Sequence, residues 1–481
     1  MQENSQDSQK NFSSKNSKTK FIVLAMAIVL VFCVGVYYSL SKNPKITVIK
    51  AFLETKDEFT NTLNDFTPTA KVGDMISKYS KDGVSDMSME FGVYPDSGET
   101  SIANLSIYSK NNPLNKQSAL GIKFDSNGFN IDADFAAIDN DIYLKAPTIY
   151  ENPIKIQAKT LGKDIANSQL NSMIDTYPEL KDLSFDFFAE PVTQEQMQKG
   201  FLKFAKPEID ALQKNMTVDT LKNDHSFKEN ANKFFDGKKL SFYTVTVKNE
   251  DMVNLTNKMQ EYAKKISDDK YKGLETEVVS NIKYDEKSGE YYTMYVAIDD
   301  KKRLVGAETN NGKSNFSLFL AGEKNTTDKI ALDFVESENE LKNIEIEFAN
   351  NGEKHDLSVS AKADNKPQKK YVEFSHDGKK ASLTVYVEER QTCDMNISDV
   401  KSGKSFTCDF ANLPATVNGM GKLNISGKLQ FSVETPEIKQ PENAQEVLKF
   451  NEKQYQDFSE QVALNLQKNY GPLIALLTMF S

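Results

Sequence analysis

Several residue types on which common functions depend are scarce in this sequence. Its 481 residues include no tryptophan, three cysteines and three histidines, and arginine occurs only at Arg303 and Arg390. Arginine is the usual bidentate partner of phosphate and guanine, and the formal net charge of −10 opposes association with polyanions. We therefore expect no nucleic-acid partner.

Motifs for catalysis and for metal binding are missing as well. His225, His355 and His376 do not stand at metal-ligand spacing, and the chain has no HExxH, no GxSxG and no glycine-rich phosphate loop after a predicted strand. The acidic residues between Asp125 and Asp141 lack the spacing of a calcium loop. We predict no catalytic residue, no metal and no cofactor, and we expect a protein that is not an enzyme.

One enzymatic alternative stays open. Glycoside hydrolysis needs two carboxyl groups at a suitable separation in space, which a sequence does not show, and acidic residues are abundant here. The absence of tryptophan, a frequent stacking platform in sugar-binding clefts, argues weakly against this alternative.

Two cysteines lie in the body of the chain. The segment from Cys393 to Cys408 predicts two strands joined by a polar turn at 398–405. A hairpin centred near Val400 places the cysteines opposite each other, where neighbouring strands reach the Cα separation of about 5.5–6 Å that a disulfide needs. We predict a disulfide between them. Two free thiols are the alternative; a two-cysteine zinc site would need further ligands, and no histidine is near in sequence.

The third cysteine lies in the one long apolar run. Phe21 to Leu40 contains no charge and no proline, and twenty helical residues span about 30 Å, the thickness of a bilayer core. A secretory signal has an apolar region of only about 7–15 residues. We predict a transmembrane helix over 21–41. Cleavage near Ser39-Leu40-Ser41 is the alternative.

The flank of this run predicts its orientation. Lys10, Lys15, Lys18 and Lys20 precede it in a polar tail that has a single aromatic residue. Such a tail cannot bury enough apolar surface to fold, and lysines beside a span favour the cytoplasmic side. We expect a disordered cytoplasmic tail over 1–20, a single-pass anchor in the cell membrane, and an extracellular body.

A helix and then a meander are predicted after the anchor. Apolar residues recur at helical spacing from Pro44 to a point before Pro68. About five alternating strands follow, with a hairpin turn at Asn127-Gly128. The apolar sets that share one face are Met87/Met89/Phe91/Val93, Ala103/Leu105/Ile107 and Phe129/Ile131/Ala133/Phe135.

The middle of the chain changes to a helical period, and a longer run of strands spans about 275–434. Thr193 with Gln196 resembles a capping box at one of the helices. Hairpin turns are predicted in the second run of strands at Asn311-Gly312, Asn351-Gly352 and Asp377-Gly378. Its apolar sets include Met294/Val296/Ile298, Phe316/Leu318/Leu320, Ile330/Leu332/Phe334 and Ile344/Ile346/Phe348.

These patterns predict an α+β fold that is mainly antiparallel β. Two β-meanders (curved sheets, a half-barrel or a sandwich) with interposed helices follow one transmembrane helix, and a C-terminal amphipathic helix closes the chain. The expected divisions are the tail 1–20, the membrane helix 21–41, a helix with the first meander and a helical insertion 42–270, the second meander 271–440, and the closing helix 441–481, which packs on the body.

A resemblance adds to this interpretation. The phrases DNDIYLKAP and KKRLVGAETNNGKSNFSLFLAGEKN, the single anchor, and the closing helix after ETPEIKQPENA resemble a family of uncharacterised membrane-anchored ectodomain proteins of low-GC Gram-positive bacteria. That family implies no activity. At the level of fold, the order of elements is similar to half-barrel lipid carriers of the LolA and LppX type, which shelter acyl chains in their concave face.

We expect a body that binds a lipid-like or other apolar ligand at the cell envelope. The second meander, over 274–433, is expected to curl around an apolar groove, with the C-terminal helix and its apolar end LIALLTMF against the mouth. The alternative is an envelope interaction or structural module without a ligand pocket, in which the same residues fill a sandwich core about 10 Å thick. The expected partners are the membrane through residues 21–40, a lipid-like ligand and an envelope protein.

Protease added to intact cells without a wall tests the predicted topology. The body should be digested and a small N-terminal fragment spared, because the membrane shields only the tail and the span. Permeabilised cells, in which the tail is also accessible, provide the control. A body that stays whole in intact cells, or that is found free in the medium, would contradict the prediction.

Overall fold

The computed structural model describes most of the chain after the predicted anchor. The described residues are 44–95, 100–126, 129–222, 225–236, 238–272, 290–310, 315–322, 327–335, 341–363, 367–386, 390–417 and 421–480. The predicted tail, the predicted membrane helix and the predicted turns at Asn127-Gly128 and Asn311-Gly312 lie outside these ranges. Within them, no helix combines the length and the apolar character needed to cross a bilayer.

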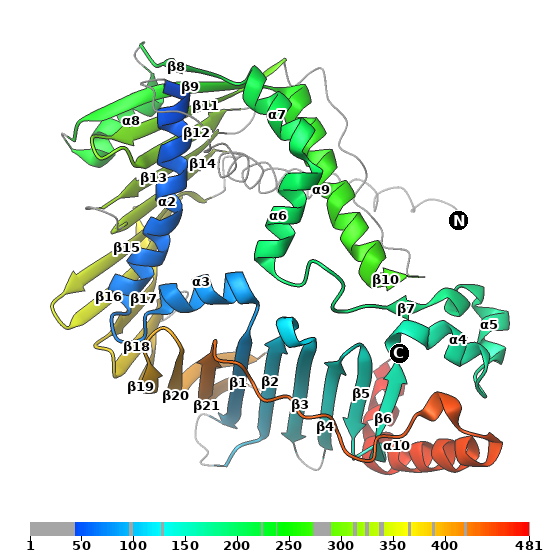
Figure 1. Cartoon of the computed structure of the whole chain (residues 1–481). Helices are drawn as coiled ribbons and strands as arrows, with labels where there is room; N and C mark the ends of the chain where they lie inside the picture. The colour runs from blue at the N-terminus through cyan, green and yellow to red at the C-terminus, as the bar shows by residue number, and fades with distance from the viewer. Residues whose placement is uncertain are drawn as a thin grey trace, which may run out of the picture.

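One curved sheet of 19 strands dominates the fold (Figure 1), and all its strand pairs are antiparallel. Its strands are β1 (Ser85–Pro95), β2 (Ala103–Asn112), β3 (Gln117–Ser126), β4 (Phe129–Ile138), β5 (Asp141–Ala146), β6 (Tyr150–Gln157), β8 (Thr217–Thr220), β9 (Leu240–Lys248), β11 (Tyr291–Asp299), β12 (Leu304–Asn310), β13 (Asn315–Ala321), β14 (Lys329–Val335), β15 (Leu341–Asn351), β16 (Lys354–Ala363), β17 (Lys369–His376), β18 (Lys380–Tyr386), β19 (Arg390–Lys401), β20 (Ser405–Val417) and β21 (Gly421–Ser432).

The chain enters this sheet in its middle. From β1 it runs strand by strand outward to β6, which forms one edge. It then passes through helices to β8 at the other edge and returns from β9 through β11 to β21. The last strand, β21, pairs with β1. A separate two-stranded sheet joins β7 (Ser184–Phe185) to β10 (Tyr271–Lys272) within the helical part.

Helices lie before the sheet, between its two runs of strands and after it. They are α2 (Pro44–Phe66), α3 (Val72–Asp82), α4 (Leu161–Ala166), α5 (Ser172–Thr176), α6 (Gln194–Phe204), α7 (Lys206–Asn215), α8 (Ser226–Phe235), α9 (Asn249–Lys270) and α10 (Glu452–Phe480), with short 3-10 helices η1 (Pro113–Asn115), η2 (Ala158–Thr160), η3 (Pro178–Asp182) and η5 (Val447–Lys449).

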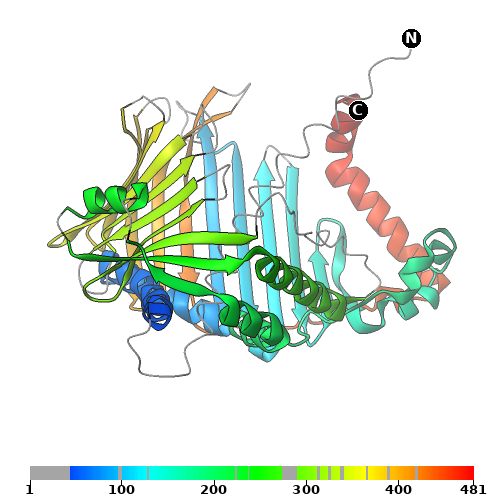
Figure 2. The same ribbon diagram turned by 90° about the horizontal axis from the view of Figure 1, so that it is seen from above.

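Alternate residues of β11 show that the two faces of the sheet are covered by different helices. Met294, Val296 and Ile298 pack with residues of α2, α6, α7 and α9, whereas Tyr295 and Ala297 pack with residues of α8. The sheet curves around α2 and α6 and leaves α8 outside (Figures 1 and 2). We call the face that carries α2 the concave face and the face that carries α8 the convex face.

Charged side chains, half-buried at Lys45 and buried at Glu58, hold α2 on the concave face. The ammonium of Lys45 donates to the carbonyl oxygen of Met216, just after α7, at 3.2 Å. Further along α2, the buried Glu58 lies 3.7 Å from the guanidinium of Arg303, which also binds Asp299 at 2.7 Å. Because a buried charge that loses its partner costs about 3–5 kcal/mol, this network holds α2 against the turn between β11 and β12.

The structure confirms a mainly antiparallel β fold with several helices. The helix predicted from Pro44 ends at Phe66, before Pro68, and both hydrogen bonds of the capping box of Thr193 and Gln196 are present. The two predicted meanders are not separate sheets, because β21 pairs with β1 and joins them. The strand β6 and the helix α8 were not predicted.

The predicted disulfide is wrong, since Cys393 and Cys408 are both free thiols. The turn of this hairpin is centred on Gly403, with Lys401 opposite Ser405, so Cys408 lies opposite Ile397 and not opposite Cys393. A hairpin centred at Val400 therefore gives the wrong pairing. Cys393 is buried within the sheet, and burial raises the pKa of its thiol.

Candidate functional site

The concave face of the first meander is mainly apolar, and several of its described side chains are exposed. On β3 and β5, Leu120 is 51% exposed, Ile122 40% and Leu144 38%. The half-buried apolar residues that share this face include Met87, Met89, Phe91, Val93, Leu105, Ile107, Phe124, Ile131, Ala133 and Phe135. A contiguous exposed apolar surface on a folded protein marks a site of binding.

The second meander differs because α2 crosses its concave face. Val296 of β11 is completely buried in a cluster with Val48 and Ala51 of α2. At the other end of α2, the ring of Phe66 packs edge-on against Phe348 of β15, with ring centroids 5.5 Å apart. Within the described chain, the exposed side chains of β3 and β5 have no such cover.

The predicted groove of the second meander stays a prediction. It was expected in the second meander, over 274–433, but the most exposed apolar side chains of the concave face belong to the first meander. Alternation in a sequence shows which side of a strand is apolar, but it does not show which strands a helix will cover. The amphipathic pattern of α2 was recognised, whereas its distant partners on β11 and β15 were not.

A cavity of about 250 Å³ lies beside this surface, under the connection between α2 and α3. Its lining is almost entirely apolar. The strands β19, β20 and β21 contribute Met395, Ile397, Cys408 and Leu429, and the connection contributes Thr67, Thr69, Ala70 and Val72. Burial raises the pKa of the Cys408 thiol, so this sulfur is a neutral, apolar part of the wall.

A cross-strand row of side chains links the cavity to the uncovered surface. Leu429, which lines the cavity, pairs with Met89 of β1. Met89 pairs with Ile107, and Ile107 pairs with Ile122. Directly opposite residues on neighbouring strands have Cβ atoms about 4.5–5.5 Å apart, so the row is a continuous apolar track from β21 to β3. We call these four residues the apolar row.

The C-terminal helix borders the same face at the far ends of the strands. The ring of Tyr470 in α10 packs edge-on against Phe129 of β4, with centroids 5.5 Å apart. Its hydroxyl donates to the carbonyl oxygen of Asn130 at 3.1 Å and lies 2.7 Å from the hydroxyl of Thr148. The helix continues to Phe480. These contacts of Tyr470 join α10 to the first meander.

A pair of stacked histidines stands between the cavity and α2. His376 lines the cavity; its Nε2 donates to the carbonyl oxygen of Phe66 at 2.7 Å, and its Nδ1 accepts from the backbone N–H of Gly378 at 3.1 Å. These two bonds require a neutral ring with its proton on Nε2. Burial lowers the pKa of His376, and the ring of His355, stacked 5.0 Å away, lowers it further.

Among the described residues, no group of three or more His, Cys, Asp or Glu side chains is placed to hold a metal ion. His355 and His376 do not stand at metal-ligand spacing in the sequence. They lie opposite each other because β16 pairs with β17. Their contact with the end of α2 was missed by the sequence reasoning, since nothing in the local spacing around either residue indicates it.

Comparison with known proteins gives no family. No protein-family profile and no characterised protein matches the sequence. Two solved structures are similar in part: the acylaminoacyl peptidase of Pyrococcus horikoshii, with 9% identity over 70% of this chain and a TM-score of 0.13, and a Trp-176-Ala mutant of transferrin binding protein B from Haemophilus parasuis Hp5, with 7% identity over 74% of this chain and a TM-score of 0.11. The chain covers 50% of the peptidase and 76% of the transferrin binding protein. These likenesses are too weak to carry any inference about the site.

Acidification tests the buried histidine. Burial lowers the pKa of His376 in the folded protein below its ordinary value of 6.5, so the unfolded chain takes up this proton first as the pH falls. The contribution of the neutral ring to the free energy of unfolding is complete above pH 6.5 and is lost progressively below it. His376→Gln should therefore flatten the dependence of that free energy on pH between about 7 and 5.5, measured by urea denaturation. His225→Gln removes a histidine on the convex side and provides the control; an unchanged slope in His376→Gln would contradict the assignment.

Proposed function

We propose that this chain is a membrane-anchored, extracytoplasmic protein that binds a lipid-like ligand on the concave face of its first meander. One observation carries the proposal: Leu120, Ile122 and Leu144 are exposed on a face where their cross-strand neighbours include Ile107, Ala133 and Phe135. Leaving apolar area in water costs about 25 cal/mol per Å². A ligand that covers this face recovers that free energy.

The apolar row suggests how an alkyl chain lies in the site. Neighbouring strands are about 4.8 Å apart, and the row crosses from β21 to β3 over three such steps, which gives about 14 Å of apolar track. The cavity at its β21 end has a volume of about 250 Å³. An apolar protein cavity of about 150 Å³ is enough to bind benzene, so this cavity accommodates the end of an alkyl chain.

The polar end of the ligand then lies away from the cavity, toward β3 and β5. No ring of charged side chains is needed there, because the row holds the ligand through its alkyl part and a polar group remains in water. This division fits ligand sites that are mainly apolar with few polar groups. It also fits a sequence in which we find no catalytic motif.

The position of the site relative to the anchor defines the kind of binding protein. The first residue of α2, Pro44, follows the predicted span 21–41 almost directly. The 23 residues of α2 extend about 35 Å at 1.5 Å per residue, and its far end, Phe66, stands beside the cavity. The site is thus held at a distance from the anchor, which suits a protein that takes a lipid out of the bilayer.

A charge placed on the concave face tests the proposal. We expect Ile122→Glu to weaken binding of a fluorescent fatty acid at least tenfold, because an alkyl chain on the apolar row would cover the new carboxylate and remove it from water, and each tenfold loss corresponds to about 1.4 kcal/mol. Lys123→Glu places the same carboxylate on the opposite face of β3 and is the matched control. The measurement is a titration of the full chain in lipid nanodiscs, with empty nanodiscs subtracted.

The two variants separate the possible results. Loss of binding in Ile122→Glu with binding retained in Lys123→Glu supports the concave site. Equal affinity in both variants and in the unsubstituted chain, or no binding above that of empty nanodiscs, would refute it and leave the interaction module without a ligand pocket as the better account. Circular dichroism of each variant shows whether the sheet is intact.

A further inference from the structure

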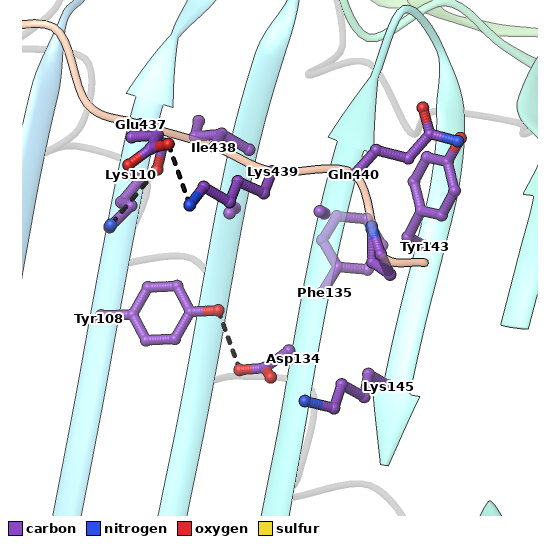
Figure 3. A pocket seen from close by; sticks show the side chains of 13 residues that line it. Tyr108, Lys110, Asp134, Phe135, Tyr143, Lys145, Glu437, Ile438, Lys439 and Gln440 are labelled. Atoms are coloured by element: carbon purple, nitrogen blue, oxygen red, sulfur yellow. Dashed lines mark hydrogen bonds and ion pairs between the residues drawn. The ribbon is translucent and has the colours of Figure 1, made fainter. Parts of the chain in front are cut away.

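A second cavity lies on the opposite, convex face of the first meander. Its volume is about 470 Å³, within the range of about 300–1,000 Å³ typical of small-molecule sites. Residues of β2 to β5 form its floor, and a segment that follows β21 crosses over them (Figure 3). We call this segment, residues 433–446, the strap; it contains no helix and no strand. Because the sheet lies between them, this cavity is independent of the concave site.

The strap is attached on both sides of the cavity. At its start, Glu434 forms an ion pair with Lys401 at 2.9 Å. At its end, Gln445 exchanges two backbone hydrogen bonds of 2.8 Å with β6: its N–H donates to Pro153, and its carbonyl oxygen accepts from Lys155. These contacts also cover the free edge of β6, which would otherwise offer unpaired backbone groups. These contacts hold the strap across the cavity.

Ile438 anchors the middle of the strap on the convex face of the sheet. Its side chain packs on a small cluster that contains Ala119, Ala136 and Tyr143. The two alanines leave room beside the isoleucine, and the tyrosine, which is buried, forms the wall at the β5 end. The cavity therefore lies between the strap and the small side chains of the sheet.

At the β2 end of the floor, a glycine makes room for an aromatic ring. Tyr108, Gly121 and Asp134 are opposite one another on three neighbouring strands. A Cβ at Gly121 would lie only 2.0 Å from the Tyr108 ring, so the ring lies across the glycine. Its hydroxyl donates to Asp134 at 2.9 Å. Burial and this bond raise the pKa of Tyr108, which stays a neutral donor.

Basic and acidic side chains both surround this floor (Figure 3). Lys145 lies directly opposite Asp134 in the register of β4 and β5, and its ammonium has no ion-pair partner in the described part of the chain. Lys439 on the strap is paired with Glu437 at 3.1 Å, and both are exposed. One oxygen of Asp134 accepts from Tyr108, which leaves its second oxygen available to a ligand.

We propose that this cavity binds an acidic saccharide. A sugar ring is flat enough to lie on the floor of Gly121, Ala119 and Ala136 beside the Tyr108 ring. Its hydroxyls are donors for the free oxygen of Asp134, and its carboxylate pairs with Lys145. A neutral sugar would leave the ammonium without a partner, and a simple anion would leave the floor and Asp134 unused. The chain has no tryptophan, and Tyr108 supplies the aromatic surface.

A matched pair of disaccharides tests this site. Cellobiouronic acid and cellobiose differ only in that a carboxylate replaces one hydroxymethyl group, and each is titrated into the full chain in lipid nanodiscs by calorimetry. We expect the acidic sugar to bind at least tenfold more tightly than the neutral one. We also expect added salt to weaken its binding, because the ion pair is near the surface.

Substitution of Lys145 tests whether the preference for the acidic disaccharide arises in this cavity. Lys145→Gln should abolish the difference between the two disaccharides and leave the structure unchanged, because the side chain is exposed. Lys123→Gln, on the same face but outside the cavity lining, is the control and should retain the difference. No binding of either sugar, equal binding of both, or a preference that survives Lys145→Gln would overturn the proposal. None of these results depends on whether the concave face binds a lipid.

Discussion

The pairing of β21 with β1 is the contact on which the architecture depends. It joins the last strand of the sheet to the first along nearly their whole lengths, from the pair Asp86 with Ser432 to the pair Pro95 with Leu423. Gly427 makes the close approach possible, since a Cβ there would lie 2.2 Å from the carbonyl oxygen of Glu90 and 2.7 Å from the side chain of Phe91. Without this contact the chain would form two meanders with two more exposed edges. With it, one sheet carries one concave face that both meanders share.

The concave face is then divided by where the helices pack. The helix α2 and the crossover helices α6, α7 and α9 pack over β9, β11 and β12, where they bury Val296 and Ile298. The first meander contributes equally apolar strands to the same face, yet Leu120 and Ile122 remain exposed. This unequal cover is the physical basis of the proposed lipid site. On the convex face the strap packs on the first meander, so the two proposed sites lie back to back on the same strands.

Local patterns in the sequence predicted much of this fold, and long-range contacts account for what was missed. The sets Met87/Met89/Phe91 and Phe129/Ile131/Ala133 share the concave face as alternation indicates, because side chains of a strand point alternately to its two sides. The joining of the meanders, the strands that α2 covers and the strap depend on residues hundreds of positions apart. The disulfide failed for a local reason, since the turn is centred on Gly403 and not near Val400, which places Cys408 opposite Ile397. The strand β6 was missed because its sequence YENPIKIQ includes a proline, which sheets tolerate at an edge.

The central claim is that an alkyl chain lies on the concave face of the first meander. A fatty acid with a photoreactive diazirine in its chain, bound to the full-length protein and then cross-linked, tests this claim most directly through the peptides that carry the label. The account predicts labels on residues of the concave face of β1 to β5 and on residues 67–72 at the cavity, with competition by unlabelled lipid. Labels confined to residues 21–40 or to the convex face, or labels that unlabelled lipid does not reduce, would contradict it.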